Sequence, residues 1–273
     1  MSTAPLDRTV VSADGTPITL TTTGTGPAVI LVAGPFDDRS SATLVTMAEE
    51  LAGSFTVTRY DRRGRGGSGD TAPYAVAREV EDLEAVIAEV GGAVRALAMC
   101  AGSGLVLHSL VAGAAVEGAV LYEPSYRPGA TPDGEGAQHI AALQQRIDRG
   151  KRASAVGYFL VRVLGMPRYA PLLLRLRPRQ WRALVAAAPT LPYDARAMDG
   201  FALPVDAFAT IDAPVLVVAG GDSTDRLKIA AHATVEAIPG SEHTVLQDQN
   251  HLVDPAALAA VATRFFQSAL RRQ

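Results

Sequence analysis

Short segments with strand-like patterns alternate with segments of helical spacing along most of this chain. The run at 28–33 is continuously apolar, which is typical of a strand buried on both faces of a sheet. Apolar residues recur at helical spacing at 76–90 and 102–111, on either side of a strand pattern at 93–98. Strands separated by helices in this way favour a parallel sheet with right-handed crossovers. We therefore predict an α/β fold with a mostly parallel, doubly wound sheet.

The N-terminal segment predicts a hairpin that precedes this alternation. Strand patterns at 9–12 and 17–23 flank Asp14-Gly15, a dipeptide typical of tight turns. The other predicted strands lie at 55–60 and 116–122, and the other predicted helices at 41–52, 227–238 and 255–270.

The pattern changes in the third quarter of the chain. Strand signals are absent there, and short helical segments are interrupted by Gly and Pro residues. The alternation then resumes, with strands predicted at 214–219 and 242–246. We therefore predict a helical insertion ahead of the last two strands. Residues 1–127 and 204–273 would form the core, and residues 128–203 a helical cap.

Composition and charge exclude several classes of protein. With 25 Lys and Arg against 28 Asp and Glu, the chain has no basic excess for binding nucleic acid. No apolar run approaches the length of a membrane span, so we expect no membrane partner. A start at Met1–Arg8 without a basic segment followed by an apolar one favours a cytoplasmic location. The expected partner is a small-molecule substrate, while the oligomeric state stays open.

The single cysteine, Cys100, limits cysteine chemistry to one position. It excludes an internal disulfide and a cysteine cluster that could hold a metal. No His, Asp or Glu spacing resembles a metal site either. We therefore expect neither a metal nor another cofactor.

Cys100 stands between the strand at 93–98 and the helix at 102–111, at the apex of a turn of small residues. This pattern is typical of a nucleophile elbow, in which a sharp strand-to-helix turn exposes one side chain above the sheet. Such a turn needs small residues two positions on either side, and Ala98 and Gly102 stand there. A helix N-terminus also favours the reactive thiolate form of cysteine. The alternative interpretation is a buried cysteine that acts as a small apolar residue.

Four motifs together resemble proteins of the α/β-hydrolase fold, nearly from end to end of the chain. They are the Gly-rich turn 60–70, the elbow at 93–107, the strand and turn at 213–222, and the segment 248–251 just before the last predicted helix. Segments 37–40, 122–124 and 193–194 are similar to hydrolases of actinobacteria. The predicted insertion lies where this family carries its cap. The resemblance therefore implies a parallel sheet, a helical cap and a catalytic triad.

Two members of the triad follow from the resemblance. Cys100 takes the position of the nucleophile, where most members of the family carry Ser, and His251 takes the position of the general base. Histidine suits this role because its pKa lies near neutrality, so that it can accept and return the thiol proton.

The acid of the triad has two candidate positions in this family. At the usual position stands Ser223, with Asp222 just before it and Asp225 two residues after it. A second arrangement places the acid at the end of the strand that follows the elbow helix, where Glu123 stands. We favour Glu123, with Asp222 as the alternative.

The expected oxyanion hole departs from the family pattern. The N–H of Ala101, the residue after the elbow, is retained as one donor. The second donor position falls on Pro35, which has no N–H, unless a shift of the loop by one residue brings in Phe36. Losing one donor costs about 2.7–4 kcal/mol of transition-state stabilisation, so ester hydrolysis would be poor. A thioester on the enzyme could then pass its acyl group to an amine, an alcohol or a carbon nucleophile.

These features predict an enzyme that acts on a small acyl or carbonyl compound, such as an ester, thioester or lactone, through a Cys-His-acid triad. Tyr158 and Trp181 of the predicted cap are the candidate substrate-binding residues. The reaction would be hydrolysis, acyl transfer or cyclisation. Two alternatives stay open, because one fold hosts many chemistries. They are a cyclase, lyase or isomerase that works in the same pocket without a covalent intermediate, and a binding protein without catalysis.

Overall fold

Eight strands form one sheet in the computed structural model, which describes residues 6–270. They are β1 (Leu6–Val11), β2 (Pro17–Gly24), β3 (Ala28–Val32), β4 (Thr56–Tyr60), β5 (Val94–Met99), β6 (Val116–Tyr122), β7 (Val215–Gly220) and β8 (Glu242–Leu246). Their order across the sheet is β1-β2-β4-β3-β5-β6-β7-β8. All neighbouring pairs from β4 to β8 are parallel, whereas β2 is antiparallel to both β1 and β4. The predicted α/β fold is confirmed; residues 1–5 and 271–273 of the predicted core lie outside the described residues.

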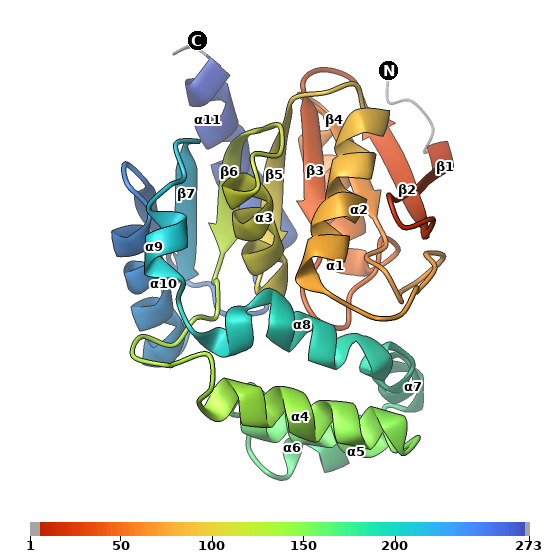
Figure 1. Cartoon of the computed structure of the whole chain (residues 1–273). Coiled ribbons are helices and arrows are strands. Elements are labelled where there is room, and N and C mark those ends of the chain that lie inside the picture. Colours follow the sequence, from red (N-terminus) through yellow and green to blue (C-terminus); the bar gives the residue numbers. More distant parts are fainter. Residues whose placement is uncertain (1–5, 271–273) are drawn as a thin grey trace.

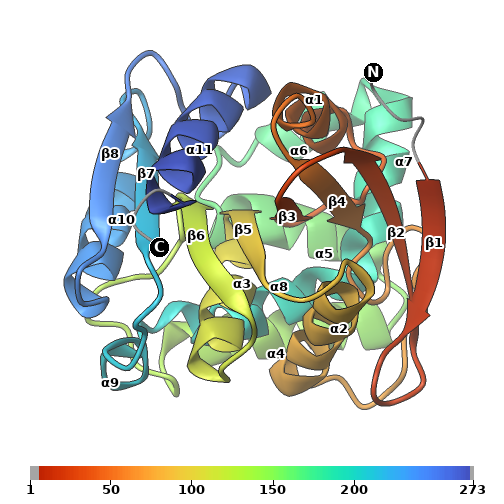
Figure 2. The same ribbon diagram turned by 90° about the horizontal axis from the view of Figure 1, so that it is seen from above.

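Helices cover both faces of the sheet (Figure 1). They are α1 (Ala42–Leu51) and α11 (Pro255–Leu270) on one face, and α2 (Val76–Glu89), α3 (Ala101–Val111) and α10 (Asp225–Ala237) on the other. Figure 2 shows α1 and α11 together on one side of the strands, with α2 and α3 on the opposite side. The two layers explain the continuous apolar run of β3. Val29 and Leu31 pack with the first layer, and Ile30 and Val32 with the second.

The segment between β6 and β7 is helical and lies across the carboxyl ends of the strands (Figure 1). Its helices are α4 (Glu135–Asp148), α5 (Arg152–Tyr158), α6 (Ala170–Arg175), α7 (Pro178–Ala187), α8 (Leu191–Ala197) and α9 (Val205–Phe208), with a π-helical turn at Phe159–Val163 and two 3-10 turns at Ala188–Thr190 and Asp199–Phe201. Helix α8 packs directly on α3. Gly104 of α3 makes this close approach possible, since a Cβ there would lie 2.2 Å from the carbonyl oxygen of Ala197 in α8. This cap therefore roofs the edge of the sheet at which the elbow lies. None of the helices within residues 6–270 has the length and apolar character needed to cross a membrane.

Candidate active site

The turn between β5 and α3 holds Cys100 in a backbone conformation that few residues other than glycine adopt. Its φ is 48° and its ψ is −120°. Gly102 permits this turn, because a Cβ there would lie 2.5 Å from the carbonyl oxygen of Val32. The Cys100 N–H donates to the carbonyl oxygen of Tyr122, at 2.9 Å, and so ties the turn to β6. The geometry is that of a nucleophile elbow, with the thiol at its apex.

Glu123 and His251 lie beside the elbow. Glu123 follows β6 and is fully buried, and its Oε2 lies 2.7 Å from Nδ1 of His251. Its other oxygen, Oε1, accepts the N–H of Gly220 at 2.9 Å. Because Nδ1 is bonded to the carboxylate, Nε2 is the imidazole nitrogen available for the hydrogen bond with Cys100. The structure thus brings a thiol, an imidazole and a carboxylate together in that order.

Hydrogen bonds set the protonation states of His251 and Glu123. Burial alone would lower the pKa of His251, but its hydrogen bonds with Cys100 and Glu123 raise that pKa to about 10. Burial alone would raise the pKa of Glu123, but hydrogen bonds from His251 and from the Gly220 N–H help to hold it below its usual value. His251 is therefore a cation and Glu123 an anion at neutral pH.

The alternative acids lie away from the imidazole. Asp222 and Asp225 are exposed, and neither bonds to His251 within the described structure. The Asp222 N–H instead donates to a carbonyl oxygen of the loop that precedes His251, at 2.8 Å. The Tyr122 hydroxyl donates to another carbonyl oxygen of this loop, that of Asn250, at 2.6 Å. Both bonds hold the loop in place, so Asp222 contributes its backbone and not its carboxylate.

The loop after β3 lies against the elbow. Pro35 and Ala101 line the same cavity as Cys100. Ala101 is the first residue of α3, so its N–H has no acceptor within the helix. Phe36 has a φ of 68°, and its N–H donates no hydrogen bond within residues 6–270. The N–H of Ala101, at the cavity, and the N–H of Phe36, next to Pro35 in the loop, are therefore candidates for an oxyanion hole, while Pro35 provides none.

The cavity beside Cys100 is small and mostly apolar. Both the core and the cap line it, through Pro35, Ala101, Ser125, Phe159, Val163, Leu164, Asp194, Met198, Phe201 and Arg226. Its volume of about 10 Å³ is room for a single water molecule. In this conformation the cavity is therefore too small to hold a substrate. Among the described residues, no group of three or more His, Cys, Asp or Glu side chains is arranged to hold a metal ion.

The two cap aromatics expected to bind substrate lie elsewhere. The Tyr158 hydroxyl is 2.9 Å from Nδ1 of His139, and the Trp181 ring lies 5.0 Å from Cζ of Arg175. Neither side chain lines the cavity beside the thiol. Consecutive residues of a helix point in different directions, and here Phe159 faces the cavity in place of Tyr158.

Comparison with known proteins assigns the chain to a family. The alpha/beta hydrolase family model matches residues 29–261. The chain belongs to the alpha/beta hydrolase family. An alpha/beta hydrolase from Sphaerobacter thermophilus DSM 20745 is 39% identical, and the match covers 95% of this chain and 100% of that one with a TM-score of 0.86. A search of curated proteins found no match.

Two esterases share the fold of this hydrolase at lower identity. One is the esterase RhEst1 from Rhodococcus sp. ECU1013, 24% identical, with 96% of this chain and 99% of that chain covered and a TM-score of 0.69. The other is a thermophilic esterase from Thermogutta terrifontis, 21% identical, with 99% of each chain covered and a TM-score of 0.73. At this identity the likeness concerns the fold alone. Family membership itself makes the chain an enzyme of the hydrolase type.

Several polar residues lie at the site of this hydrolase although no functional role was predicted for them from the sequence. Ser125 places its Oγ 3.4 Å from Sγ of Cys100. Asp194 of α8 accepts Nη1 of Arg62 at 2.8 Å and Nη2 of Arg65 at 2.6 Å, all three side chains being buried. Its second oxygen, Oδ2, is buried and has no partner within the described residues. The three basic residues of the turn 60–70 were a signal for buried acids, but nothing in the sequence indicated which acids.

The two arginines also hold the loop beside the elbow. Nη1 of Arg65 donates to the carbonyl oxygen of Gly34 at 2.6 Å, and Nη1 of Arg62 to that of Ala33 at 3.3 Å. Arg62 is paired in addition with Glu79 of α2, at 2.6 Å. The Gly-rich turn therefore ties together the loop at the oxyanion position, the core helix α2 and the cap.

Proposed function

We propose that the chain is an acyl-transferring cysteine hydrolase that acts on small esters, thioesters or lactones through Cys100, His251 and Glu123. The observation that carries this proposal is the hydrogen bond between His251 and the buried carboxylate of Glu123, beside a thiol at a nucleophile elbow. Nucleophile, base and orienting acid follow one another as covalent acyl transfer requires.

In the first step the Cys100 thiolate attacks the carbonyl carbon of the substrate and forms a C–S bond. The carbonyl oxygen becomes an oxyanion, which the N–H groups of Ala101 and Phe36 stabilise. The His251 imidazolium gives its Nε2 proton to the departing alcohol or thiol as the bond to the carbonyl carbon breaks. The products are an acyl thioester on Cys100 and a free alcohol or thiol.

In the second step the acyl group leaves the enzyme. Neutral His251 takes a proton from water or another nucleophile, which attacks the thioester carbon. Glu123 stabilises the imidazolium that forms, and Cys100 departs as the thiolate. The cycle thus ends in the same ionic state in which it begins.

Stopped-flow kinetics with p-nitrophenyl acetate test this proposal. We expect a burst of p-nitrophenolate equal to the concentration of enzyme, followed by slower turnover. Cys100→Ala abolishes the burst, and His251→Ala slows it. Activity that survives Cys100→Ala but is lost in His251→Ala contradicts the covalent step and supports a reaction in the same pocket without a covalent intermediate, with His251 as acid or base.

Pro35 supports transfer to an acceptor other than water as a second candidate for the same site. It removes one N–H from the donor loop, and the apolar cavity has room for little water. If the thioester is long-lived, added hydroxylamine competes with water for the acyl group. The ratio of acyl hydroxamate to free acid shows how the acyl group divides between hydroxylamine and water. Formation of free acid alone at high hydroxylamine concentration excludes the transfer reaction.

A further inference from the structure

The cap carries a long stretch of positive charge without any acidic residue. From residue 149 to residue 193 there are nine Lys and Arg and no Asp or Glu: Arg149, Lys151, Arg152, Arg162, Arg168, Arg175, Arg177, Arg179 and Arg182. The whole chain has a net charge of −3, so the net charge of this segment is opposite in sign to that of the rest of the chain. Like charges gathered in this way repel one another and attract anions.

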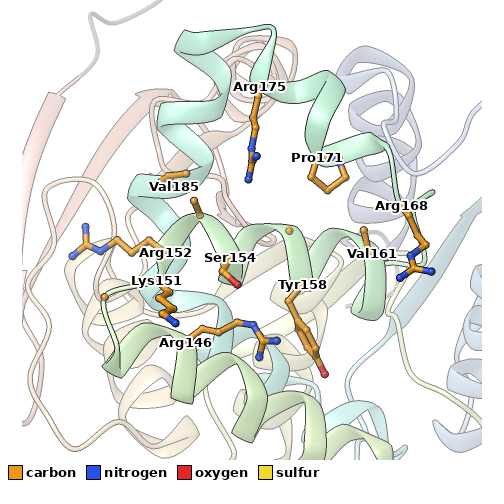
Figure 3. A pocket seen from close by; sticks show the side chains of 13 residues that line it. Arg146, Lys151, Arg152, Ser154, Tyr158, Val161, Arg168, Pro171, Arg175 and Val185 are labelled. Atoms are coloured by element: carbon orange, nitrogen blue, oxygen red, sulfur yellow. The ribbon is translucent and has the colours of Figure 1, made fainter.

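Five of the basic side chains of the cap line one groove on its outer face. They are Arg146, Lys151, Arg152, Arg168 and Arg175, and no carboxylate is among the lining residues. Figure 3 shows Arg175 reaching toward α5 from one side, while Arg146 lies along the opposite side of that helix, with Ser154 between them. None of the five forms an ion pair within residues 6–270. The groove therefore concentrates cations that lack an acidic partner within the described residues.

Aromatic rings hold the guanidinium groups of Arg146 and Arg175 in place. Cζ of Arg146 lies 4.3 Å from the centroid of the Tyr158 ring, and Cζ of Arg175 lies 5.0 Å from that of Trp181. Nη1 of Arg146 donates to the carbonyl oxygen of Ala142 at 2.6 Å, and the stacking leaves its other N–H donors and those of Arg175 available for an anion. The two aromatic residues thus have a role on this face of the cap.

The walls of the groove also offer apolar surface. Val161, Pro171 and Val185 lie beside the cations, and the volume of about 890 Å³ is far larger than that of the cavity at the thiol. Arginine binds phosphate oxygens with two parallel hydrogen bonds, and several cations suit a group with more than one negative charge. We propose that this groove binds the phosphate group of an amphiphilic phosphate ester, with its apolar part against these walls.

The groove is separate from the catalytic cavity. Along the segment 158–164, Tyr158 and Val161 line the groove, whereas Phe159, Val163 and Leu164 line the cavity beside the thiol. This segment includes the π-helical turn Phe159–Val163, a rare structure that is frequent at functional sites. A ligand in the groove therefore touches the wall of the cavity from its outer side, and the binding does not depend on the reaction proposed above.

Calorimetric titration with octyl phosphate, a soluble single-chain phosphate ester, tests the site. We expect saturable binding of octyl phosphate that weakens with added salt, and no binding of octyl glucoside, which has the same chain without the charge. The double variant Lys151→Glu/Arg175→Glu lies outside the catalytic machinery. It should bind octyl phosphate at least tenfold more weakly, because it loses two charged hydrogen-bond donors and places two carboxylates beside the phosphate.

The double variant Arg177→Glu/Arg179→Glu is the matched control, because it changes the charge equally at exposed positions that do not line the groove. It should retain affinity to within about threefold, the loss expected from screened long-range attraction. Equal loss in both variants, or no binding by the unaltered protein, overturns the proposal. Vesicles of equal parts phosphatidic acid, a phosphate monoester like octyl phosphate, and phosphatidylcholine identify the source of the phosphate. If the protein sediments with the vesicles and the groove variant does not, the ligand is a phospholipid head group. If the protein binds octyl phosphate but does not sediment with the vesicles, the ligand is a soluble phosphate ester.

Discussion

At the residue scale, the carboxylate of Glu123 both orients the imidazole of His251 and holds its positive charge. Glu123→Gln keeps the shape of the side chain but removes the charge and changes the hydrogen bond to Nδ1. We expect kcat/KM to fall roughly 10³–10⁴-fold, the effect of neutralising the acid of such a triad. Asp222→Asn is the control and should leave activity within about twofold, because surface changes away from a site have little effect. Loss of activity in Asp222→Asn alone would show that the acid is misassigned.

The raised pKa of His251 predicts how the reaction depends on pH. Since the imidazole keeps its proton up to a pKa of about 10, it can protonate the leaving group throughout the neutral range. The rate of acylation should therefore fall only as pH rises through about 10. Glu123→Gln removes one of the two groups that raise this pKa, so the fall should move to lower pH. Single-turnover acylation rates of both proteins, corrected for the spontaneous reaction, locate this fall. A decline in the unaltered protein that starts near pH 6.5, the ordinary pKa of histidine, contradicts this protonation state.

At the element scale, the elbow depends on the close approach of α3 to the end of β3. A Cβ at Gly102 would lie 2.5 Å from the Val32 carbonyl oxygen and 2.8 Å from that of Ala33. Gly102→Ala should therefore lower the free energy of unfolding by about 2–3 kcal/mol, as overpacking does, and slow acylation by moving the loop beside the thiol. Gly53→Ala, which meets no atom within 4 Å, should change stability by less than about 0.5 kcal/mol. Urea unfolding compares the two variants, and equal effects would contradict the clash.

The secondary structure of the core was predictable because its signals are local. The predicted helix at 76–90 is observed as α2 (Val76–Glu89), and the predicted strand at 116–122 as β6 (Val116–Tyr122). The facing of the cap side chains was not predictable. Tyr158 and Phe159 are consecutive aromatic residues in a helical pattern. Only the packing of the π-helical turn decides which of them lines the cavity. Periodicity predicts a helix but not the orientation of an irregular turn within it.

At the scale of the whole molecule, a buried cluster of charges joins the cap to the core. Asp194 of the cap accepts hydrogen bonds from Arg62 and Arg65, which are 132 and 129 residues away along the chain. A contact between positions so distant depends on the tertiary fold, so the sequence could not reveal it. The roles predicted for Cys100, His251 and Glu123 were accessible from sequence because short local motifs at the elbow, after the strand at 116–122 and before the last helix resemble those of the family.

Asp194→Ala tests how much this cluster stabilises the molecule. The substitution leaves two buried guanidinium groups without one of their partners, so the free energy of unfolding should fall by about 3–5 kcal/mol. Glu81→Ala breaks the more exposed ion pair of Arg78 with Glu81 and should cost less than about 1 kcal/mol. Thermal and urea unfolding of both variants give the comparison. Equal small losses would mean that the cap is held by its apolar contacts alone.

The covalent step at Cys100 is the central claim, and intact-mass spectrometry with peptide mapping tests it most directly. After the protein is mixed with p-nitrophenyl acetate at neutral pH and quenched in acid, we expect the mass to rise by one acetyl group. The peptide that carries Cys100 should hold this group, and hydroxylamine should remove it. Cys100→Ala should acquire no acetyl group under the same conditions. An unaltered protein that hydrolyses the ester at full rate without any adduct on Cys100 would contradict the claim.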